Sequence, residues 1–286
     1  MLTNDESPLP DTEVHYLRSE HVGDEFKVLV GHCGSPDSAP SAVLFMGDTW
    51  ANFGTAVETI RLLRLTDVVP PLLVVGAGYR TTDMGEIEAL RCRDFTPTAD
   101  PASGYTDPAK VGAGRFLAFL RDELKPWVRE RYGSDPDDSM FFGDSRGGLF
   151  ATYVLVTEPT TFPRYGIGSP ALGWNQEVMF KLEAEYAEAH DDLTARVVFA
   201  VGAYEDPAGD ARFLAQLRPD QRAEWEGEGY IPEDYVGYCE RMVAALRSRG
   251  YPSLQIECEV LPGEYHETAP PLNLSRSLRY LFDAPR

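Results

Sequence analysis

The sequence is poor in cysteine and histidine and contains no long hydrophobic segment. Its four cysteines have no C-x-x-C spacing; they are Cys33, Cys92, Cys239 and Cys258. Neither a zinc site nor a disulfide framework is indicated, and we expect reduced, mostly buried thiols. The first residues are neither basic nor apolar, and no later stretch is long and apolar enough to span a bilayer. These features predict a cytoplasmic protein without a membrane partner.

Positive charge is also scarce. The 286 residues include 26 Lys and Arg against 46 Asp and Glu, which gives a formal net charge of -20. A chain this acidic repels nucleic acid and anionic surfaces, so we expect a small-molecule partner and no nucleic acid. Internal repeats and low-complexity tracts are missing, which favours one domain over residues 1–286.

Short apolar runs alternate with segments of helical period. The runs predict strands with both faces covered, at 25–32, 41–47, 70–78, 139–143, 164–169, 195–202 and 254–261. The periodic segments predict helices at 52–65, 111–132, 233–250 and 272–282, and GGLFATYVLV predicts another at 147–156. Alternating strands and helices predict an α/β fold with a mostly parallel central sheet and helices on both faces. In such sheets a ligand binds beyond the carboxyl ends of the strands.

One turn between a predicted strand and a predicted helix contains a serine among glycines. The stretch FFGDSRGGLF places Ser145 in a G-x-S-x-G pattern, with Gly143 before it and Gly147 after it. This is the setting of a nucleophile elbow, in which glycines permit a tight turn and the helix start favours a developing negative charge. The alternative is a glycine-rich helix start that Ser145 merely caps.

A serine nucleophile needs a base and an acid later in the chain. Hydrolases of this architecture supply their residues in the order Ser, Asp or Glu, His. His266 follows the apolar run 254–261 in a turn-rich loop, whereas His190 lies in a polar stretch typical of a solvated helix end, and the other histidines precede the serine. Glu205, after the run 195–202, is the preferred acid, and Asp206 is the alternative.

Four stretches together resemble the esterase family of α/β hydrolases. They are AVLFMGDTWANF, RCRDFTPT, FFGDSRGGLFATY and the pair VGAYE and LPGEYH. The family includes enterochelin esterases, S-formylglutathione hydrolases and mycolyltransferases, and the chain is most similar to the enterochelin (ferric enterobactin) esterase branch. The resemblance implies a single α/β-hydrolase domain that cleaves a small-molecule ester or lactone of siderophore or natural-product type. It implies no metal and no cofactor.

The resemblance also implies roles for individual residues. Ser145, Glu205 and His266 would be the nucleophile, the acid and the base, and the backbone N–H groups of Asp48 and Arg146 would form the oxyanion hole. Met46 and Gly47 stand where the family usually has Asp-Gly, which leaves the donor itself in place.

Four side chains are candidates for substrate binding: Trp50, Arg91, Arg146 and Trp174. Arg146 would bind an anionic group of the substrate, or would instead pair with Asp144. Arg91, predicted in a loop after the strand 70–78, would add positive charge, with an Arg93–Asp94 network as the alternative reading of that stretch. The two tryptophans would line the cleft or belong to the core.

Two other functions fit the same residues. An acyltransferase would hand the acyl group of the same acyl-enzyme to an alcohol or amine instead of water. A non-catalytic protein of the same fold would bind a small ligand without reacting.

Overall fold

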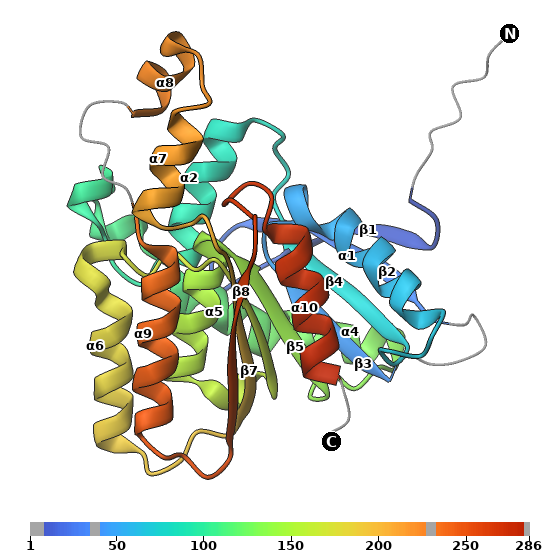
Figure 1. Ribbon diagram of the computed structural model, residues 1–286. Helices are drawn as coiled ribbons and strands as arrows, with labels where there is room; N and C mark the ends of the chain where they lie inside the picture. The colour runs from blue at the N-terminus through green and yellow to red at the C-terminus, as the bar shows by residue number, and fades with distance from the viewer. Residues whose placement is uncertain (1–8, 35–40, 227–232, 283–286) are drawn as a thin grey trace, which may run out of the picture.

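The computed structural model describes residues 9–34, 41–226 and 233–282. Its strands form one eight-stranded sheet in the order β1-β2-β4-β3-β5-β6-β7-β8 (Figure 1). They are β1 (Thr12–Arg18), β2 (Glu25–Cys33), β3 (Ala42–Met46), β4 (Leu72–Gly78), β5 (Ser139–Asp144), β6 (Arg164–Gly168), β7 (Ala195–Gly202) and β8 (Leu254–Leu261). β2 is antiparallel to both of its neighbours, and all the other pairs are parallel. The mostly parallel sheet that the apolar runs predict is confirmed.

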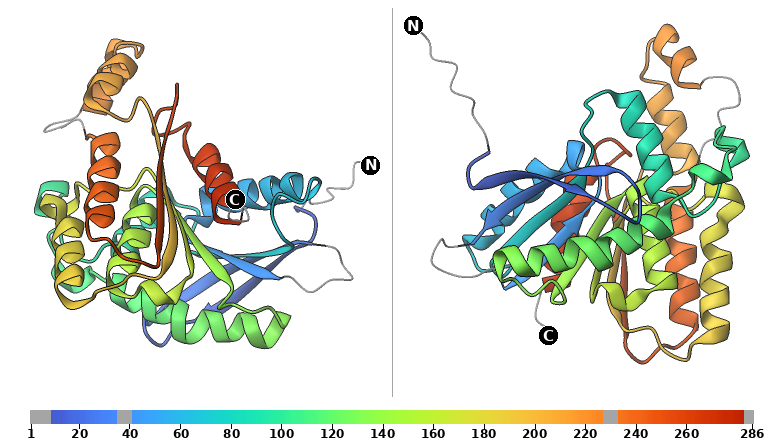
Figure 2. Two further views of the ribbon diagram at one scale, coloured as in Figure 1. Left: turned by 60° about the horizontal axis from the view of Figure 1, so that its bottom comes forward. Right: turned by 180° about the vertical axis from the view of Figure 1, so that it is seen from behind.

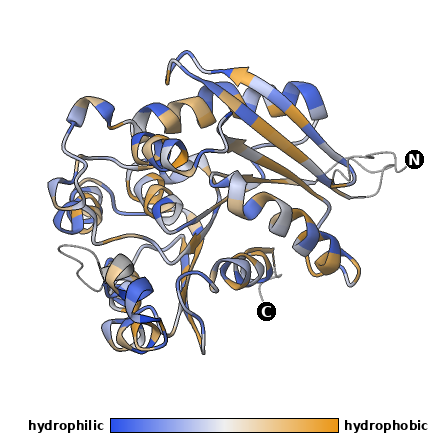
Figure 3. Cartoon of the chain, turned by 90° about the horizontal axis from the view of Figure 1, so that it is seen from above, coloured by the Kyte–Doolittle hydropathy of each residue, from blue (hydrophilic) through white to orange (hydrophobic). Residues whose placement is uncertain are grey.

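Helices cover both faces of the sheet. They are α1 (Thr49–Arg64), α2 (Met84–Phe95), α3 (Ala113–Ala118), α4 (Lys125–Tyr132), α5 (Arg146–Thr157), α6 (Trp174–Ala189), α7 (Pro207–Leu214), α8 (Pro219–Glu226), α9 (Tyr235–Ser248) and α10 (Pro270–Phe282). A π-helical turn, η3 (Phe119–Leu124), joins α3 to α4, and the short 3₁₀ turns are η1 (Pro101–Ser103), η2 (Pro108–Lys110) and η4 (Pro159–Thr161). Hydrophobic and hydrophilic residues alternate along the helices (Figure 3), as expected where one side of a helix is buried.

Two hydrophobic clusters correspond to the two faces of the sheet. Successive side chains of a strand point to opposite faces, so Phe141 packs with Phe150 of α5 in one cluster. Phe142 belongs to the other cluster, with Ile60 of α1 and Leu278 of α10. The helix formed by α3, η3 and α4 lies across the first face near β1 and β2, and α1 and α10 lie on the second (Figure 2).

The differences from the sequence prediction have physical causes. β1 was not predicted because it is an edge strand with alternating exposure, and its Val14 and Tyr16 are exposed. The placement of Arg91 in a loop is wrong: residues 84–95 form α2, whose buried side includes Arg91 and Asp94 beside apolar residues. Charges on the buried side of α2 conceal its amphipathic period. Helices α6, α7 and α8 were also not predicted.

The carboxyl ends of β5, β7 and β8 meet at one edge of the sheet. The chain leaves these strands at Asp144, Gly202 and Leu261. α7 and α8 stand above this edge (Figure 1). In the described part of the chain, no helix is long and apolar enough to cross a membrane.

Candidate active site

Ser145 lies on a sharp turn between β5 and α5. Its φ of 57° and ψ of -117° are unusual for a residue with a side chain. The Ser145 N–H donates to the carbonyl of Gly168 (2.9 Å), and the Ser145 carbonyl accepts from the N–H groups of Leu149 and Ala171 (3.0 and 3.1 Å). The Ser145 side chain makes no capping hydrogen bond to α5. The turn therefore holds the backbone on both sides, and the alternative in which the hydroxyl only caps the helix is wrong.

The glycines around the serine let α5 approach β5 and β6 closely. A Cβ atom at Gly143 would lie 2.1 Å from the carbonyl oxygen of Gly147, and one at Gly148 would lie 2.6 Å from that of Gly168. Both obstacles are backbone atoms that cannot rotate away, so only glycine fits at these positions.

The turn places Ser145 within hydrogen-bond distance of His266. The Nε2 of His266, which lies in the loop after β8, is 3.0 Å from the Oγ of Ser145. Its Nδ1 is 2.6 Å from the Oε2 of Glu205 in the loop after β7. A carboxylate at Nδ1 favours the tautomer that carries its proton there, which leaves Nε2 free to accept the serine proton. The three residues singled out in the sequence are thus side by side.

Glu205 is buried, and both of its carboxylate oxygens have hydrogen-bond partners. Its Oε1 accepts hydrogen bonds from the Gly202 N–H (2.7 Å) and from the Ser169 hydroxyl (2.6 Å). Asp206, the alternative acid, instead caps α7 by accepting from the Gly209 N–H (2.5 Å). The geometry favours Glu205 as the partner of His266.

The surroundings raise the pKa of His266. Burial lowers it, but the hydrogen bond and the charge of Glu205, together with the charge of Asp144, outweigh burial. The ring of Tyr235 lies 4.7 Å from the imidazole, centroid to centroid. The imidazolium that forms when His266 takes a proton is therefore stabilised by two nearby carboxylates.

A buried polar network supports these residues and was not predicted from the sequence. The amide of Asn273 in α10 donates to Asp144 (2.8 Å) and to the hydroxyl of Ser169 (3.0 Å). Burial raises the pKa of Asp144 to about 6. Ser169 has a detectable signal, because it is the polar residue that directly follows the strand 164–168. Asn273 has none, because it is one amide on an amphipathic helix.

Asp48 and Arg146 begin two helices beside the serine. Asp48 precedes α1 and Arg146 is the first residue of α5. The first N–H groups of a helix have no partner within it and can hold a negative charge. Arg146 pairs with Glu88 of α2 through Nη1, not with Asp144 as in the alternative prediction.

The other candidate binding residues differ in exposure. Trp50 is 52% exposed and borders a cavity of about 330 Å³, whose wall also includes Lys27, Asp48, Tyr79, Met84 and Ile87. Trp174 is buried, donates to the Thr98 carbonyl (2.9 Å) and lies under the guanidinium of Arg146. Arg91 is buried between carboxylates, and Arg93 pairs with Asp94 as the alternative prediction holds (2.7 Å).

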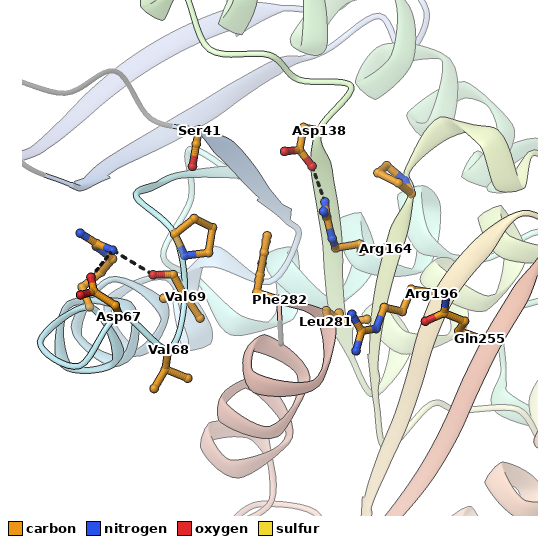
Figure 4. Close-up of a pocket in the computed structure, with 13 residues that line it drawn as sticks. Ser41, Asp67, Val68, Val69, Asp138, Arg164, Arg196, Gln255, Leu281 and Phe282 are labelled. Atoms are coloured by element: carbon orange, nitrogen blue, oxygen red, sulfur yellow. Dashed lines mark hydrogen bonds and ion pairs between the residues drawn. The ribbon is translucent and has the colours of Figure 1, made fainter. Parts of the chain in front are cut away.

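A second cavity, of about 710 Å³, lies at the opposite edge of the sheet (Figure 4). Its lining includes Asp138, Arg164 and Arg196, which precede or begin strands, and Leu281 and Phe282 at the end of α10. Arg164 pairs with Asp138, and Arg196 stacks on Tyr280 (4.8 Å). None of the triad candidates lines this cavity, so it is separate from the candidate site.

The four cysteines are free thiols, and most of them are buried. Cys33, Cys92 and Cys239 are buried and Cys258 is partly buried, all four as free thiols, as expected. Among the residues that the structure describes, His, Cys, Asp and Glu side chains form no group of three that could hold a metal ion.

Comparison with known proteins identifies the family. A profile of the family described as "Putative esterase" matches residues 39–231. The chain belongs to this esterase family. It is 27% identical to the ferri-bacillibactin esterase BesA of Bacillus subtilis, over 97% of this chain and 92% of that protein. It is 26% identical to the siderophore triacetylfusarinine C esterase of Aspergillus fumigatus, over 96% of this chain and 94% of that protein.

Solved structures show the same fold. The siderophore hydrolase EstA from Aspergillus nidulans superposes with a TM-score of 0.78 at 20% identity, over 96% of this chain and 97% of that one. The esterase-family chain thus has the α/β-hydrolase fold expected from its resemblance to the enterochelin esterase branch.

The tight turn predicts that only glycine is tolerated at position 143. We expect Gly143→Ala to reduce esterase activity at least about a hundredfold and to destabilise the protein by several kcal/mol, because its Cβ collides with backbone. The matched control is Gly54→Ala, an exposed helical position with no atom near the added Cβ, where alanine should stabilise by about 0.5–1 kcal/mol. Urea unfolding and ester hydrolysis measure both effects; an active, stable Gly143→Ala enzyme would contradict this account of the turn.

Proposed function

We propose that the protein is a serine hydrolase that cleaves a small-molecule ester or lactone through an acyl-enzyme, with Ser145, His266 and Glu205 as its triad. The observation that carries the proposal is the continuous hydrogen-bonded chain from Ser145 Oγ through His266 to Glu205 (3.0 and 2.6 Å). Proton transfer from a serine to an imidazole oriented by a carboxylate is the requirement for this chemistry.

In the first half of the reaction Ser145 becomes acylated. His266 Nε2 takes the hydroxyl proton while Oγ attacks the ester carbonyl, and Glu205 stabilises the imidazolium. The tetrahedral oxyanion accepts hydrogen bonds from the N–H groups of Arg146 and Asp48, which act where negative charge develops. The intermediate then breaks its bond to the leaving alcohol, which receives the proton from His266.

In the second half water replaces the alcohol. His266 removes a proton from the water as it attacks the acyl carbonyl, and the same N–H groups hold the second oxyanion. Breaking the bond to Oγ releases the carboxylic acid, and the proton returns to Ser145. These steps need no metal and no cofactor.

The relatives and the guanidinium of Arg146 beside the serine support a proposal for the substrate class. The two relatives are named as a ferri-bacillibactin esterase and a siderophore triacetylfusarinine C esterase. The guanidinium of Arg146 pairs with Glu88 and is partly exposed. We therefore propose a siderophore-type ester or lactone whose anionic group contacts Arg146, with Trp50 beside the cavity as a contact for its apolar part.

Loss of the nucleophile tests the proposal directly. Ser145→Ala should abolish hydrolysis of a simple aryl ester and labelling by a fluorophosphonate probe, because the hydroxyl makes the covalent bond. The thermal unfolding curve should stay unchanged, since little packing is lost. Residual activity within about tenfold of the parent, which is roughly 1.4 kcal/mol in barrier, would contradict the assignment. If product shifts to an ester when an alcohol is added, the enzyme is an acyltransferase.

The triad acid is tested through its effect on His266. Glu205→Gln should lower kcat by at least roughly a hundredfold, since losing this carboxylate costs up to about 10⁴ in the serine proteases. Asp206→Asn should cost less than about fivefold, because asparagine is an equally good helix cap.

The pH profile separates charge from simple damage in the same variants. The base must be neutral, so kcat/KM of the parent should fall as pH drops through the raised pKa of His266, above the ordinary imidazole value of about 6.5. Glu205 raises this pKa, so in Glu205→Gln the fall should move to lower pH. A midpoint that does not move would exclude Glu205 as the partner.

Arg146 is expected to affect anionic substrates selectively. Arg146→Gln should raise KM for a carboxylate- or catecholate-bearing ester by about tenfold, equal to about 1.4 kcal/mol, and leave KM for a neutral aryl ester within about twofold. The control is Arg241→Gln: Arg241 also pairs with a carboxylate, Glu177, and lies over a ring, but on α9. Equal effects on both substrates would reject an anion contact.

A further inference from the structure

The backbone conformation of Asp48 is unfavourable, so other contacts must stabilise it. Its φ of 45° and ψ of 38° are left-handed, which costs a residue with a side chain roughly 1 kcal/mol. The Asp48 carbonyl accepts from the N–H groups of Ala51 and Asn52 (both 3.1 Å), whereas its side chain makes no capping hydrogen bond to α1. The carboxylate of Asp48 is therefore used elsewhere.

That carboxylate is held by Arg91 of α2. The Nε of Arg91 donates to Oδ1 of Asp48 (2.6 Å), and its Nη2 donates to Oδ2 (3.1 Å). Both side chains are buried, at 10% and 5% exposure. A bidentate guanidinium–carboxylate contact restricts the orientation of the carboxylate as well as its distance from the guanidinium. Arg91 therefore limits rotation of the Asp48 side chain. A Cβ at Gly147 would lie 2.6 Å from Oδ2, so the carboxylate also packs on the start of α5.

The same helix reaches the second proposed oxyanion residue. Glu88, one turn before Arg91, accepts from Arg91 Nη1 (2.5 Å) with Oε1 and pairs with Arg146 through Oε2. Burial raises the pKa of Glu88, but the charges of Arg91 and Arg146 outweigh burial and lower it overall. The side chains of Asp48, Arg91, Glu88 and Arg146 thus form one alternating chain of charges.

We propose that Arg91 is a positioning residue that holds Asp48 in its left-handed conformation and thereby directs the Asp48 N–H at the oxyanion, with Glu88 linking this donor to Arg146. The inference rests on the proposed function. Its physical reason is that oxyanion donors act only if they already point to the place where charge develops, because reorienting them costs part of the stabilisation gained. An ion pair that only attaches α2 to the sheet would stabilise the fold without this effect.

The test compares two arginines of the same helix. Arg91→Gln should lower kcat for a neutral aryl ester by at least about tenfold and change KM less than about twofold, because the lost stabilisation belongs to the transition state. Arg93 is the matched control: it forms a bidentate contact with Asp94 (2.7 and 2.9 Å) and also donates to Asp24, not to Asp48 or Glu88. Arg93→Gln should keep kcat within about twofold at a temperature where both variants are folded.

A transition-state mimic supplies a readout that a structural role would not change. Across the parent, Arg91→Lys and Arg91→Gln, the inhibition constant of an aryl trifluoromethyl ketone should rise by the same factor by which kcat/KM falls. Lysine keeps the positive charge but cannot make the bidentate contact. The kcat of Arg91→Lys should therefore lie between that of the parent and that of Arg91→Gln. An inhibition constant that stays constant while kcat falls would overturn the proposal.

A rescue variant separates conformation from stability. Glycine adopts the left-handed region without strain and keeps its N–H, so Asp48→Gly combined with Arg91→Gln should regain at least about threefold in kcat over Arg91→Gln alone. No gain, or equal losses in Arg91→Gln and Arg93→Gln, would overturn the inference. If the parent itself is not labelled by fluorophosphonate, the proposed function fails; if it is labelled and Arg91→Gln is as fast, only the role of Arg91 fails.

Discussion

The tight turn at Ser145, with its positive φ, is the constraint on which the rest of the site depends. A positive φ at this residue turns the chain from β5 directly into α5 and requires the two elements to touch at Gly143 and Gly147. The turn brings the hydroxyl to the edge where β7 and β8 also end, so that two loops distant in sequence can supply Glu205 and His266. It also places the open amino end of α5 beside the hydroxyl. One local conformation thus determines which residues can act on a common atom.

Hydrogen bonds carry this order outward from the serine. Ser169 connects Glu205 to Asn273, and Asn273 connects both to Asp144, the residue before Ser145. Hydrogen bonds between buried polar groups restrict the arrangement of these groups. Ion pairs likewise link the side chains from Asp48 through Arg91 and Glu88 to Arg146. In a protein of net charge -20, this chain of charges still leaves the guanidinium of Arg146 partly exposed, with a side-chain exposure of 24%.

The sequence predicts those parts of the structure that depend on one simple property. Continuous apolar runs identify the strands that are covered on both faces, and the glycines identify the turn at Ser145. β1 is not predictable in this way because half of its residues are exposed. α2 is not predictable because Arg91 and Asp94 lie on its buried side. Glu205 and Asp206 are equivalent in a pattern of letters; they differ only in space, where one approaches His266 and the other caps α7. Partners that tertiary packing creates, such as Glu88 and Asn273, leave no local pattern in the sequence.

The loops that carry Glu205 and His266 are joined to each other by their backbones. The Ala203 N–H donates to the Leu261 carbonyl (2.8 Å) and the Tyr204 N–H donates to the Glu264 carbonyl (3.0 Å), which extends the pairing of β7 with β8 beyond the strands. The chain leaves this junction into α7 and α8 only after Glu205. The two loops therefore behave like a short continuation of the sheet, so that the carboxylate of Glu205 and the imidazole of His266 are kept in register as opposite residues of neighbouring strands are.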